Sequence, residues 1–211
     1  MVHPRALRPF GWIIVGLLWI SAVAAGLGAI TRYEYTPGPP AGAPASWPSA
    51  SRISRHEGRF TLVLFAHPEC PCTRASLAEL GRMRTRFKGH LDTSIQFRKP
   101  GMTLAEAQSI GLWQTAAEFP GVALALDSAG EEMRAFGAAV SGQAVLYDPT
   151  GRLIFTGGLT GARGQEGPNA GIEAVQRLVL GLIEARSPLH SPVFGCSLLT
   201  PSTEKGARWT L

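Results

Sequence analysis

An uncharged apolar stretch near the N-terminus most constrains how this chain of 211 residues is organised. No charged residue lies between Pro9 and Thr31, and the segment 10–30 reads FGWIIVGLLWISAVAAGLGAI. A helix of this length, rising about 1.5 Å per residue, crosses a hydrocarbon layer of about 30 Å. Its apolar residues cover every side, whereas a core helix normally keeps a polar face. We therefore expect residues 1–31 to form a cytoplasmic tip and a transmembrane anchor.

The charges around this stretch predict its orientation. Arg5 and Arg8 precede it, and Arg32 follows it. The positive-inside rule then places the short N-terminus in the cytoplasm and the rest of the chain outside. In a bacterium this is the inner membrane, with the folded part on the periplasmic side. A cleaved signal peptide is the alternative, because small alanines at 22–25 could precede a cleavage point, although its apolar region normally spans only about 7–15 residues.

The rest of the chain divides by composition. Residues 32–58 are rich in Pro, Gly, Ala and Ser, which bury little apolar surface and predict an extended linker. Residues 59–187 suffice for one well-cored domain, and residues 188–211 form a tail that carries Cys196. Lys and Arg outnumber Asp and Glu 20 to 15, but the basic residues form no run, so we expect no nucleic-acid binding.

The first folded motif is a strand, a turn and a helix around two cysteines. Residues 60–67, FTLVLFAH, form a continuous apolar run that predicts a strand buried on both faces. A turn follows at 68–73, PECPCT, and apolar residues then recur at helical spacing: Leu77, Leu80, Met83 and Phe87. Pro71 suits the first helical position, which places Cys70 at the N-cap and Cys72 at the second helical position.

The remaining pattern alternates strands with helices. We expect strands at 91–97 and 122–126, helical regions at 103–119 and 131–136, a hairpin of 143–147 with 153–156 around Asp-Pro-Thr-Gly, and a last helix at 171–186. This alternation is typical of an α/β fold.

This order of elements, with a Cys-Pro at the first strand-to-helix turn, resembles the thioredoxin-like superfamily across roughly residues 58–186. With the apolar anchor, three segments are similar to membrane-anchored thioredoxin-like proteins of the RedB type: FAHPECPCTRASLAEL, SGQAVLYDPTGRLIFTGGLTGARGQEGPNAG and VFGC. The resemblance implies a thioredoxin-like central mixed sheet flanked by helices and preceded by one transmembrane helix. It also implies protein thiols and disulfides as partners, although the fold alone does not establish a disulfide reductase.

Cys70 is the candidate nucleophile, because a helix N-terminus favours the thiolate over the thiol. In the thioredoxin-like family the motif is C-x-x-C, with the first cysteine attacking and the second resolving. Aligned to it, Cys70-Pro71-Cys72-Thr73 puts Thr73 at the resolving place. The other register begins at Glu69 and leaves Cys72 as the only matched cysteine. Pro71 suits both registers, and the first keeps a thiol at the helix cap.

Two cysteines compete as the resolving thiol. A disulfide between Cys70 and Cys72 would close a small ring against the helical geometry, and such strain makes a disulfide easily reduced. Cys196 is the alternative if the tail folds back to the first helix. It is otherwise a small buried hydrophobe after Val193 and Phe194.

Three further features could support the chemistry. His67, at the strand end, could stabilise a thiolate, move a proton or ligate a metal, or it could simply cap the strand. Peroxiredoxin-like peroxidases carry a threonine at this place, so His67 gives little support to peroxidase activity. Thioredoxin-like proteins have a cis-proline before the strand that faces the site, whereas here Ser141-Gly142 stands there, and Gly142 would let a ligand or a second backbone approach closely. The glycine-rich loop 157–171, which contains Arg163, is either a ligand contact or a solvated loop.

These features leave two main functions open. The first is a membrane-anchored extracytoplasmic thiol–disulfide oxidoreductase without a cofactor, in which Cys70 attacks and Cys72 or Cys196 resolves. The second is a copper-binding or copper-delivery protein without turnover, in which Cys70, Cys72, Cys196 and His67 or His190 hold Cu(I), because thiolates and imidazole suit that ion. A catalytically idle adaptor is the third.

Overall fold

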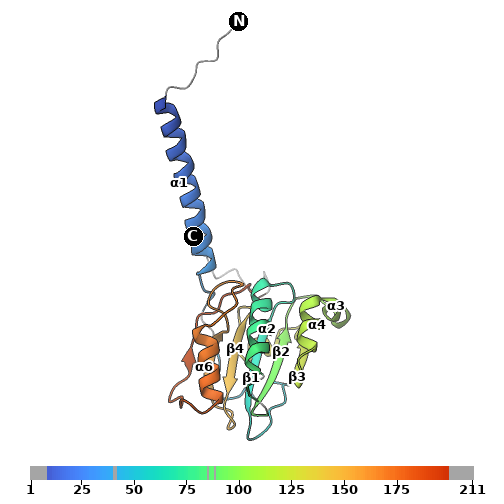
Figure 1. The fold of residues 1–211 in the computed structure, drawn as a ribbon. Coiled ribbons are helices and arrows are strands. Elements are labelled where there is room, and N and C mark those ends of the chain that lie inside the picture. The colour runs from blue at the N-terminus through green and yellow to red at the C-terminus, as the bar shows by residue number, and fades with distance from the viewer. Residues whose placement is uncertain (1–8, 40–41, 85, 88, 200–211) are drawn as a thin grey trace. The chain divides into compact units, whose positions relative to one another are not determined.

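The computed structural model describes residues 9–39, 42–84, 86–87 and 89–199, which divide between Thr36 and Pro37 into two compact units. The first unit is the helix α1 (Pro9–Glu34) in Figure 1. Its segment Gly11–Glu34 is long and apolar enough to cross a membrane, by length and composition, and none of it is buried against protein. The expectation of an N-terminal apolar helix that could span a membrane is confirmed.

The second unit is built on a six-stranded mixed sheet with the order β3-β2-β1-β4-β5-β6. The strands are β1 (Phe60–Ala66), β2 (Leu91–Phe97), β3 (Val122–Leu126), β4 (Gln143–Tyr147), β5 (Leu153–Gly158) and β6 (Leu189–His190). The central strand β1 pairs in parallel with β2 and antiparallel with β4, β2 pairs in parallel with β3, and β4 with β5 forms the predicted hairpin. The added strand β6 is the start of the tail and runs parallel to β5.

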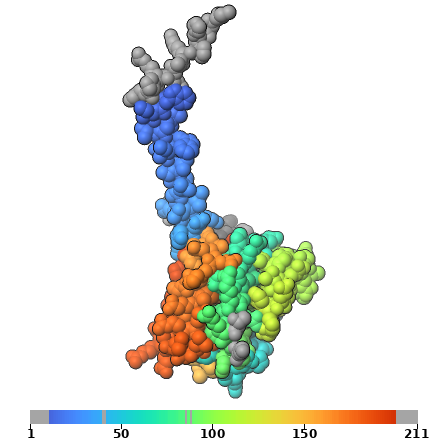
Figure 2. Space-filling model, viewed as in Figure 1, coloured from blue at the N-terminus to red at the C-terminus, as the bar shows by residue number. Residues whose placement is uncertain are grey.

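In the described part of this unit, the strands are connected by the helices α2 (Pro71–Arg84), α3 (Leu104–Ser109), α4 (Gly111–Ala117), α5 (Glu131–Ala135) and α6 (Ala170–Val179). Helices α2, α4 and α6 cover one face of the sheet (Figure 1), and Figure 2 shows them side by side on one surface, with α6 in orange, α2 in green and α4 in yellow-green. A central β1 followed by α2, a parallel β2, an antiparallel hairpin and a returning α6 is the thioredoxin-like arrangement. The predicted fold class is confirmed.

The predicted helices differ from the observed ones at two places. The region 103–119 is two helices, because Ile110 takes an extended conformation between them. The last helix ends at Val179 and not at residue 186. Gly181 there has φ +67°, and the Leu182 N–H bonds to the Arg177 carbonyl, a helix-ending motif that satisfies the last carbonyls.

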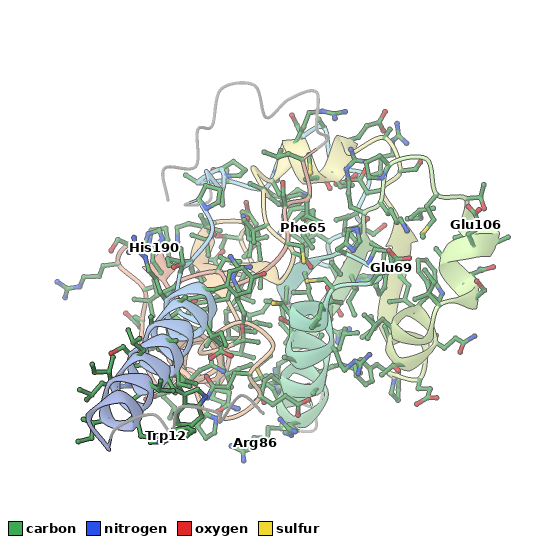
Figure 3. All side chains as sticks on the ribbon, turned by 90° about the horizontal axis from the view of Figure 1, so that it is seen from above. Trp12, Phe65, Glu69, Arg86, Glu106 and His190 are labelled. Atoms are coloured by element: carbon green, nitrogen blue, oxygen red, sulfur yellow. The ribbon has the colours of Figure 1, made fainter. Side chains whose placement is uncertain are left out.

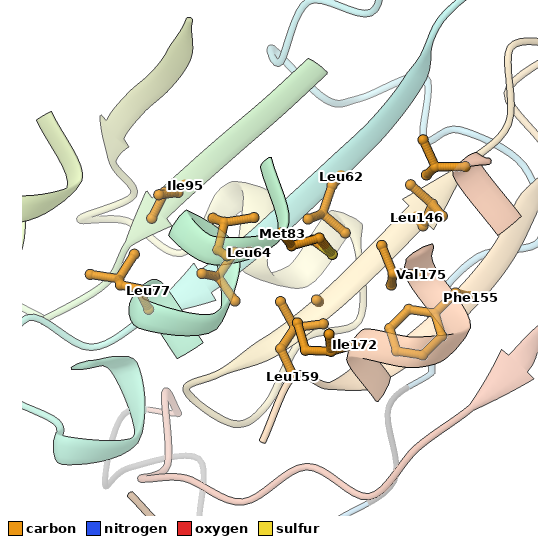
Figure 4. Packing of buried hydrophobic residues seen from close by; sticks show 14 of the residues in the cluster. Leu62, Leu64, Leu77, Met83, Ile95, Leu146, Phe155, Leu159, Ile172 and Val175 are labelled. Carbon is orange, nitrogen blue, oxygen red and sulfur yellow. The ribbon is translucent and has the colours of Figure 1, made fainter. Parts of the chain in front are cut away.

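The core explains the continuous apolar run of β1, because successive side chains of a strand point to opposite faces of the sheet. Figure 4 shows Leu62 and Leu64 of β1 packing with Met83 of α2 and Val175 of α6. Phe65 belongs to the second cluster, on the other face, with residues including Met133, Phe136 and Tyr147. Strand β1 is thus buried on both sides, and its end at Ala66 is a rigid support for the turn that follows.

The segment 32–58, predicted as an extended linker, differs from that expectation from Pro37 onward, where the chain belongs to the compact second unit. Trp47 donates its backbone N–H to the Gly151 carbonyl at 2.8 Å, and its ring lies edge-on against Phe136 and Tyr147 with centroids 5.1 Å away in each case. The Tyr147 hydroxyl donates to the Pro44 carbonyl at 2.9 Å. The aromatic ring of Trp47 and hydrogen bonds of the backbone therefore attach a segment whose proline and glycine content predicts a linker.

Candidate active site

The turn between β1 and α2 places Cys70 directly before the first residue of the helix. The Cys70 carbonyl accepts the helical hydrogen bond from the Arg74 N–H at 3.3 Å, and the Cys70 N–H donates to the His67 carbonyl at 3.2 Å. Pro71 is the first helical residue, where the absence of an N–H costs no hydrogen bond. The sequence-predicted positions of Cys70, Pro71 and Cys72 at the helix N-terminus are those observed.

The tail returns to this turn. Residues 192–199, the C-terminal segment below, run antiparallel to residues 139–141 in front of β4, with an isolated bridge between Val140 and Ser197. The Ser141 N–H donates to the Cys196 carbonyl, and the Leu198 N–H donates to the Ala139 carbonyl, both at 2.8 Å. Three side chains of the segment are buried: Val193, Phe194 and Leu198. The segment is therefore docked by backbone hydrogen bonds around one antiparallel bridge and by buried apolar side chains.

Gly195 allows the backbone of the C-terminal segment to lie close to the backbone of Ser141. A Cβ atom built on Gly195 would lie 1.8 Å from the Ser141 carbonyl oxygen, which is backbone and cannot yield cheaply. The Gly195 carbonyl in turn accepts a hydrogen bond from the Arg163 guanidinium at 2.7 Å. Only a residue without a side chain fits between Phe194 and Cys196.

The docked segment brings two sulfurs together that are 126 positions apart in the sequence. The Cys70 Sγ and Cys196 Sγ atoms are 2.9 Å apart. Cys70 exposes 1% of its surface and Cys72 exposes 4%, whereas Cys196 is exposed. The structure thus brings the predicted Cys196 to the predicted nucleophile, and it makes Cys70 a buried residue and Cys196 an exposed one.

Hydrogen bonds converge on the Cys70 sulfur and lower the pKa of Cys70 to about 4. The largest contribution is the hydrogen bond from the Cys72 thiol. Burial raises the pKa of Cys70 and so opposes this effect. The Cys196 thiol and the backbone N–H groups of Thr73 and Cys196 donate further hydrogen bonds, which lower the pKa of Cys70. Because donors favour the charged acceptor, Cys70 is a thiolate at neutral pH.

The other two thiols stay protonated. The pKa of Cys72 is raised well above its usual range, first by its hydrogen bond to Cys70 and then by burial. The pKa of Cys196 is raised to about 11, first by burial and then by its hydrogen bond to Cys70, with the charge of Arg163 acting in the opposite direction. The site therefore holds one thiolate that accepts hydrogen bonds from two thiols.

Thr73 links three parts of the site through buried hydrogen bonds. Its hydroxyl donates to the His67 carbonyl at 2.9 Å and lies 2.7 Å from the Ser141 hydroxyl. The His67 N–H donates to the Ser141 hydroxyl at 2.9 Å and to the Thr73 hydroxyl at 3.1 Å. Thr73 and Ser141 both expose 0% of their surface. Thr73 therefore positions the turn against residues 139–142, whereas a C-x-x-C protein would have its resolving cysteine at this place.

The His67 side chain caps the turn. Its Nδ1 accepts a hydrogen bond from the Glu69 N–H at 3.3 Å, and the ring is half-buried. Burial lowers the pKa of His67, although the neighbouring charges of Cys70 and Glu69 act in the opposite direction. A neutral imidazole that accepts a backbone hydrogen bond fits the strand-capping interpretation of His67.

Gly142 stands where the family resemblance would place a cis-proline, and the structure gives the reason for a glycine there. Its φ is +88°, and no cis peptide bond occurs among the residues that the structure describes. The Gly142 N–H donates to the Phe65 carbonyl at 2.8 Å. The left-handed φ favours glycine, and a Cβ atom there would lie 3.1 Å from the Ser76 Oγ atom and 3.5 Å, an ordinary contact distance, from the Phe194 carbonyl oxygen of the C-terminal segment.

The glycine-rich loop 157–171 holds the site together from a third side. Besides the bond from Arg163 to Gly195, the Gly164 N–H donates a hydrogen bond to the Cys72 thiol. Asn169 caps α6 by accepting from the Ile172 N–H at 3.1 Å. The sequence marked Arg163 only as one polar residue of a flexible loop and gave Ser141 no role, because the partners of both lie far away in the chain.

A pocket of about 420 Å³ opens beside the turn, and its lining includes Cys70, Pro71, Arg74, Ile110 and Leu112. Within the part of the chain that the structure describes, no group of three or more His, Cys, Asp or Glu residues is arranged to hold a metal ion. His190, a candidate copper ligand by sequence, lies on β6, across the domain from Glu69 in the turn (Figure 3).

Comparison with known proteins supports the fold. No family model and no curated protein matches this chain. An uncharacterized conserved protein from Geobacillus kaustophilus is 17% identical over 79% of this chain and 94% of its own, with a TM-score of 0.57. A hypothetical protein from Sinorhizobium meliloti 1021 is 21% identical over 67% of this chain and 80% of its own, with a TM-score of 0.54. At these identities the two structures show a shared fold alone.

A secreted disulfide oxidoreductase of Mycobacterium tuberculosis is also among the matching structures. It is 13% identical over 59% of this chain and 83% of its own, with a TM-score of 0.43.

Proposed function

We propose that this chain is a membrane-anchored, extracytoplasmic thiol–disulfide oxidoreductase whose redox pair is Cys70 and Cys196. The observation that carries the proposal is the 2.9 Å separation of their sulfurs, one at a helix N-terminus and the other on a docked segment. A disulfide needs a separation of about 2 Å, which a small movement of the C-terminal segment supplies. The apolar α1, with Arg5 and Arg8 before it, supports a domain on the extracytoplasmic side.

Cys72 serves the pair as a hydrogen-bond donor. Its thiol stabilises the Cys70 thiolate, and its own raised pKa makes it a poor nucleophile. Cys72 also lies in the first turn of α2, where a disulfide to Cys70 would work against the helical geometry. Of the two resolving thiols that the sequence left open, we choose Cys196.

The electrostatics favour the oxidising direction. The Cys70–Cys196 disulfide takes two electrons from a partner dithiol, which becomes a disulfide, and the chain is left with a Cys70 thiolate and a Cys196 thiol. A disulfide whose reduced form is stabilised as a thiolate is a strong oxidant. The lowered pKa of Cys70 therefore supports the donation of disulfides to proteins, in agreement with an extracytoplasmic location.

Serine variants of the three cysteines test the proposal in the full chain, solubilised in detergent. The assay is the oxidation of a reduced dithiol peptide under a constant supply of oxidised glutathione. Cys70→Ser and Cys196→Ser should each lower the rate by about 10³-fold, because neither can form the disulfide. Cys72→Ser is the matched control and should retain measurable turnover. It removes the hydrogen bond from the Cys72 thiol to Cys70 but leaves both cysteines of the redox pair in place.

The other outcomes assign the other functions. Loss of turnover in Cys72→Ser with full activity in Cys196→Ser would make Cys70–Cys72 the pair. Oxidation of the peptide at the background rate by the full chain and by all three serine variants would indicate a catalytically idle adaptor. Stoichiometric binding of Cu(I) that protects all three thiols, with no peptide oxidation, would support copper delivery.

A reporter fusion tests the location separately. An enzyme that is active only outside the cytoplasm, fused after Leu211, should be active. Activity of a cytoplasmic reporter alone would reverse the orientation.

A further inference from the structure

The two cysteines of the pair differ in exposure. Cys70 is 1% exposed although it lines a pocket, and its sulfur lies 2.9 Å from the Cys196 sulfur of the docked C-terminal segment. Cys196 is exposed, and so is Ser197 next to it. The backbone groups of Ser141 and Ala139 that could receive an extended partner are already bonded to Cys196 and Leu198.

We propose that Cys196 is the sulfur that meets the partner and that Cys70 is the internal leaving group. This assignment rests on the proposed function and specifies its mechanism. The sequence interpretation made Cys70 the cysteine that reacts with the partner first. The exposures of the two residues favour Cys196 for that role.

The exchange proceeds in two steps. A partner thiolate attacks the Cys196 Sγ of the disulfide, a bond forms between the partner sulfur and Cys196, and the Cys70–Cys196 bond breaks with its electron pair leaving on Cys70. The second thiol of the partner then loses its proton and attacks the partner sulfur of the mixed disulfide, and Cys196 departs and takes up a proton. The partner dithiol has been oxidised by two electrons, and one proton is released because Cys70 stays a thiolate.

The surroundings of each sulfur suit this division. A thiol of low pKa leaves faster, and the hydrogen bonds from Cys72 and from the Thr73 N–H stabilise Cys70 as it leaves. On the other side, the Arg163 guanidinium is fixed to the Gly195 carbonyl, and its positive charge acts on Cys196. A cation beside Cys196 attracts the negatively charged thiolate that attacks there.

The site of attack can be read directly from a mixed disulfide. The full chain in detergent is oxidised, mixed with reduced glutathione for a short time and quenched in acid, and the modified cysteine is located by mass spectrometry after digestion in acid. We expect glutathione on Cys196, in excess over Cys70 by at least about tenfold, because the attacked sulfur keeps the incoming thiol. A thiol-bearing polyethylene glycol of protein-like size should give the same site.

The results separate this inference from the proposed function. If the Cys70–Cys196 disulfide forms but glutathione is found on Cys70, the inference is wrong. It is also wrong if the large thiol gives no adduct. Both results leave the assignment of the redox pair intact. Failure of the disulfide to form would overturn the proposed function.

Two arginine variants give an independent readout. Arg163→Gln should slow the attack of an anionic thiol several-fold and that of a neutral thiol much less, and added salt should reduce the difference. Arg74→Gln is the matched control, because Arg74 is exposed and lines the pocket beside Cys70. A larger effect of Arg74→Gln would place the attack on Cys70 through that pocket and contradict the assignment.

Discussion

The turn at residues 67–73 and the C-terminal segment each supply one sulfur to the site, and they are held in place in different ways. The turn is defined mainly by local features, which are the end of β1, the proline at the start of α2 and hydrogen bonds between near neighbours, with Ser141 as a distant hydrogen-bond partner. The segment is held by contacts with residues far away in the chain: two backbone bonds to residues 139–141, three buried apolar side chains and Arg163. Pairing therefore depends on tertiary docking, whereas the Cys70 thiolate is stabilised first by Cys72 of the helix and further by hydrogen bonds from the docked Cys196.

The largest expected effect comes from undocking the segment while the turn stays intact. Gly195→Ala introduces a Cβ atom at 1.8 Å from the Ser141 carbonyl oxygen, so the segment must move. We expect the effective concentration of Cys196 at Cys70 to fall by about 10²-fold, because a misplacement of about 1 Å costs that much in a positioned reaction. The measurement is the fraction of Cys70–Cys196 disulfide in a series of glutathione buffers.

The matched control for this variant is Gly161→Ala. A Cβ atom there meets nothing closer than 3.7 Å, so the loop accepts it and the disulfide should form as in the parent chain. Equal disulfide formation in both variants would show that the docking of Gly195 does not set the distance between the sulfurs.

A smaller effect is expected from the hydroxyl pair that joins the two regions. Thr73→Val removes the bonds of Thr73 to His67 and Ser141 at a fully buried place. The free energy of unfolding should fall by about 1–3 kcal/mol, because partners are left unsatisfied. Denaturant unfolding of the full chain in detergent measures it.

Ser76→Ala is the control for the hydroxyl pair. Ser76 exposes 0% of its surface and its Oγ atom has no hydrogen-bond partner among the described residues, so its removal should leave the free energy of unfolding unchanged or raise it. A loss as large as that of Thr73→Val would mean that volume, and not hydrogen bonding, decides both results.

The pH dependence of the reduction potential sharpens the comparison of the two sulfurs. Cys70, with its pKa lowered to about 4, takes up no proton on reduction between about pH 5 and 8, whereas Cys196, with its pKa raised to about 11, takes up one. One proton for two electrons lowers the potential by about 30 mV per pH unit. A slope of about 60 mV would mean that both thiols are protonated.

The same shifts set the stability of the reduced chain. The depressed pKa of Cys70 contributes stability that is lost as pH falls from about 9 toward 4, because the unfolded chain binds one more proton there. The raised pKa of Cys196 contributes stability that is lost as pH rises above about 9. The free energy of unfolding of the oxidised chain, in which neither Cys70 nor Cys196 titrates, is the reference for both changes.

Local patterns in the sequence predicted most of the sheet and the turn. The bounds of β2, β3 and β4 coincide with the predicted strands, and Cys70 precedes the first helical residue as the position of Pro71 indicated. The end of α6 differs because Gly181 turns the chain, and glycine in a helical pattern is an ambiguous signal.

Features that depend on distant contacts could not be predicted in this way. Trp47 attaches a segment of linker composition to Phe136 and Tyr147, and neither partner is recognisable from the segment itself. The same holds for the C-terminal segment, whose Val193 and Phe194 indicated burial without naming residues 139–141 as the place. The sequence thus made Cys196 a candidate, and only the tertiary structure brings it to Cys70.

The most direct test of the central claim is to identify the disulfide in the oxidised full chain. The protein is equilibrated with oxidised and reduced glutathione, alkylated in acid and mapped by peptide mass spectrometry. Docking of the C-terminal segment predicts one intramolecular disulfide, between Cys70 and Cys196, with Cys72 alkylated as a free thiol. A disulfide between Cys70 and Cys72, with Cys196 free, would contradict it.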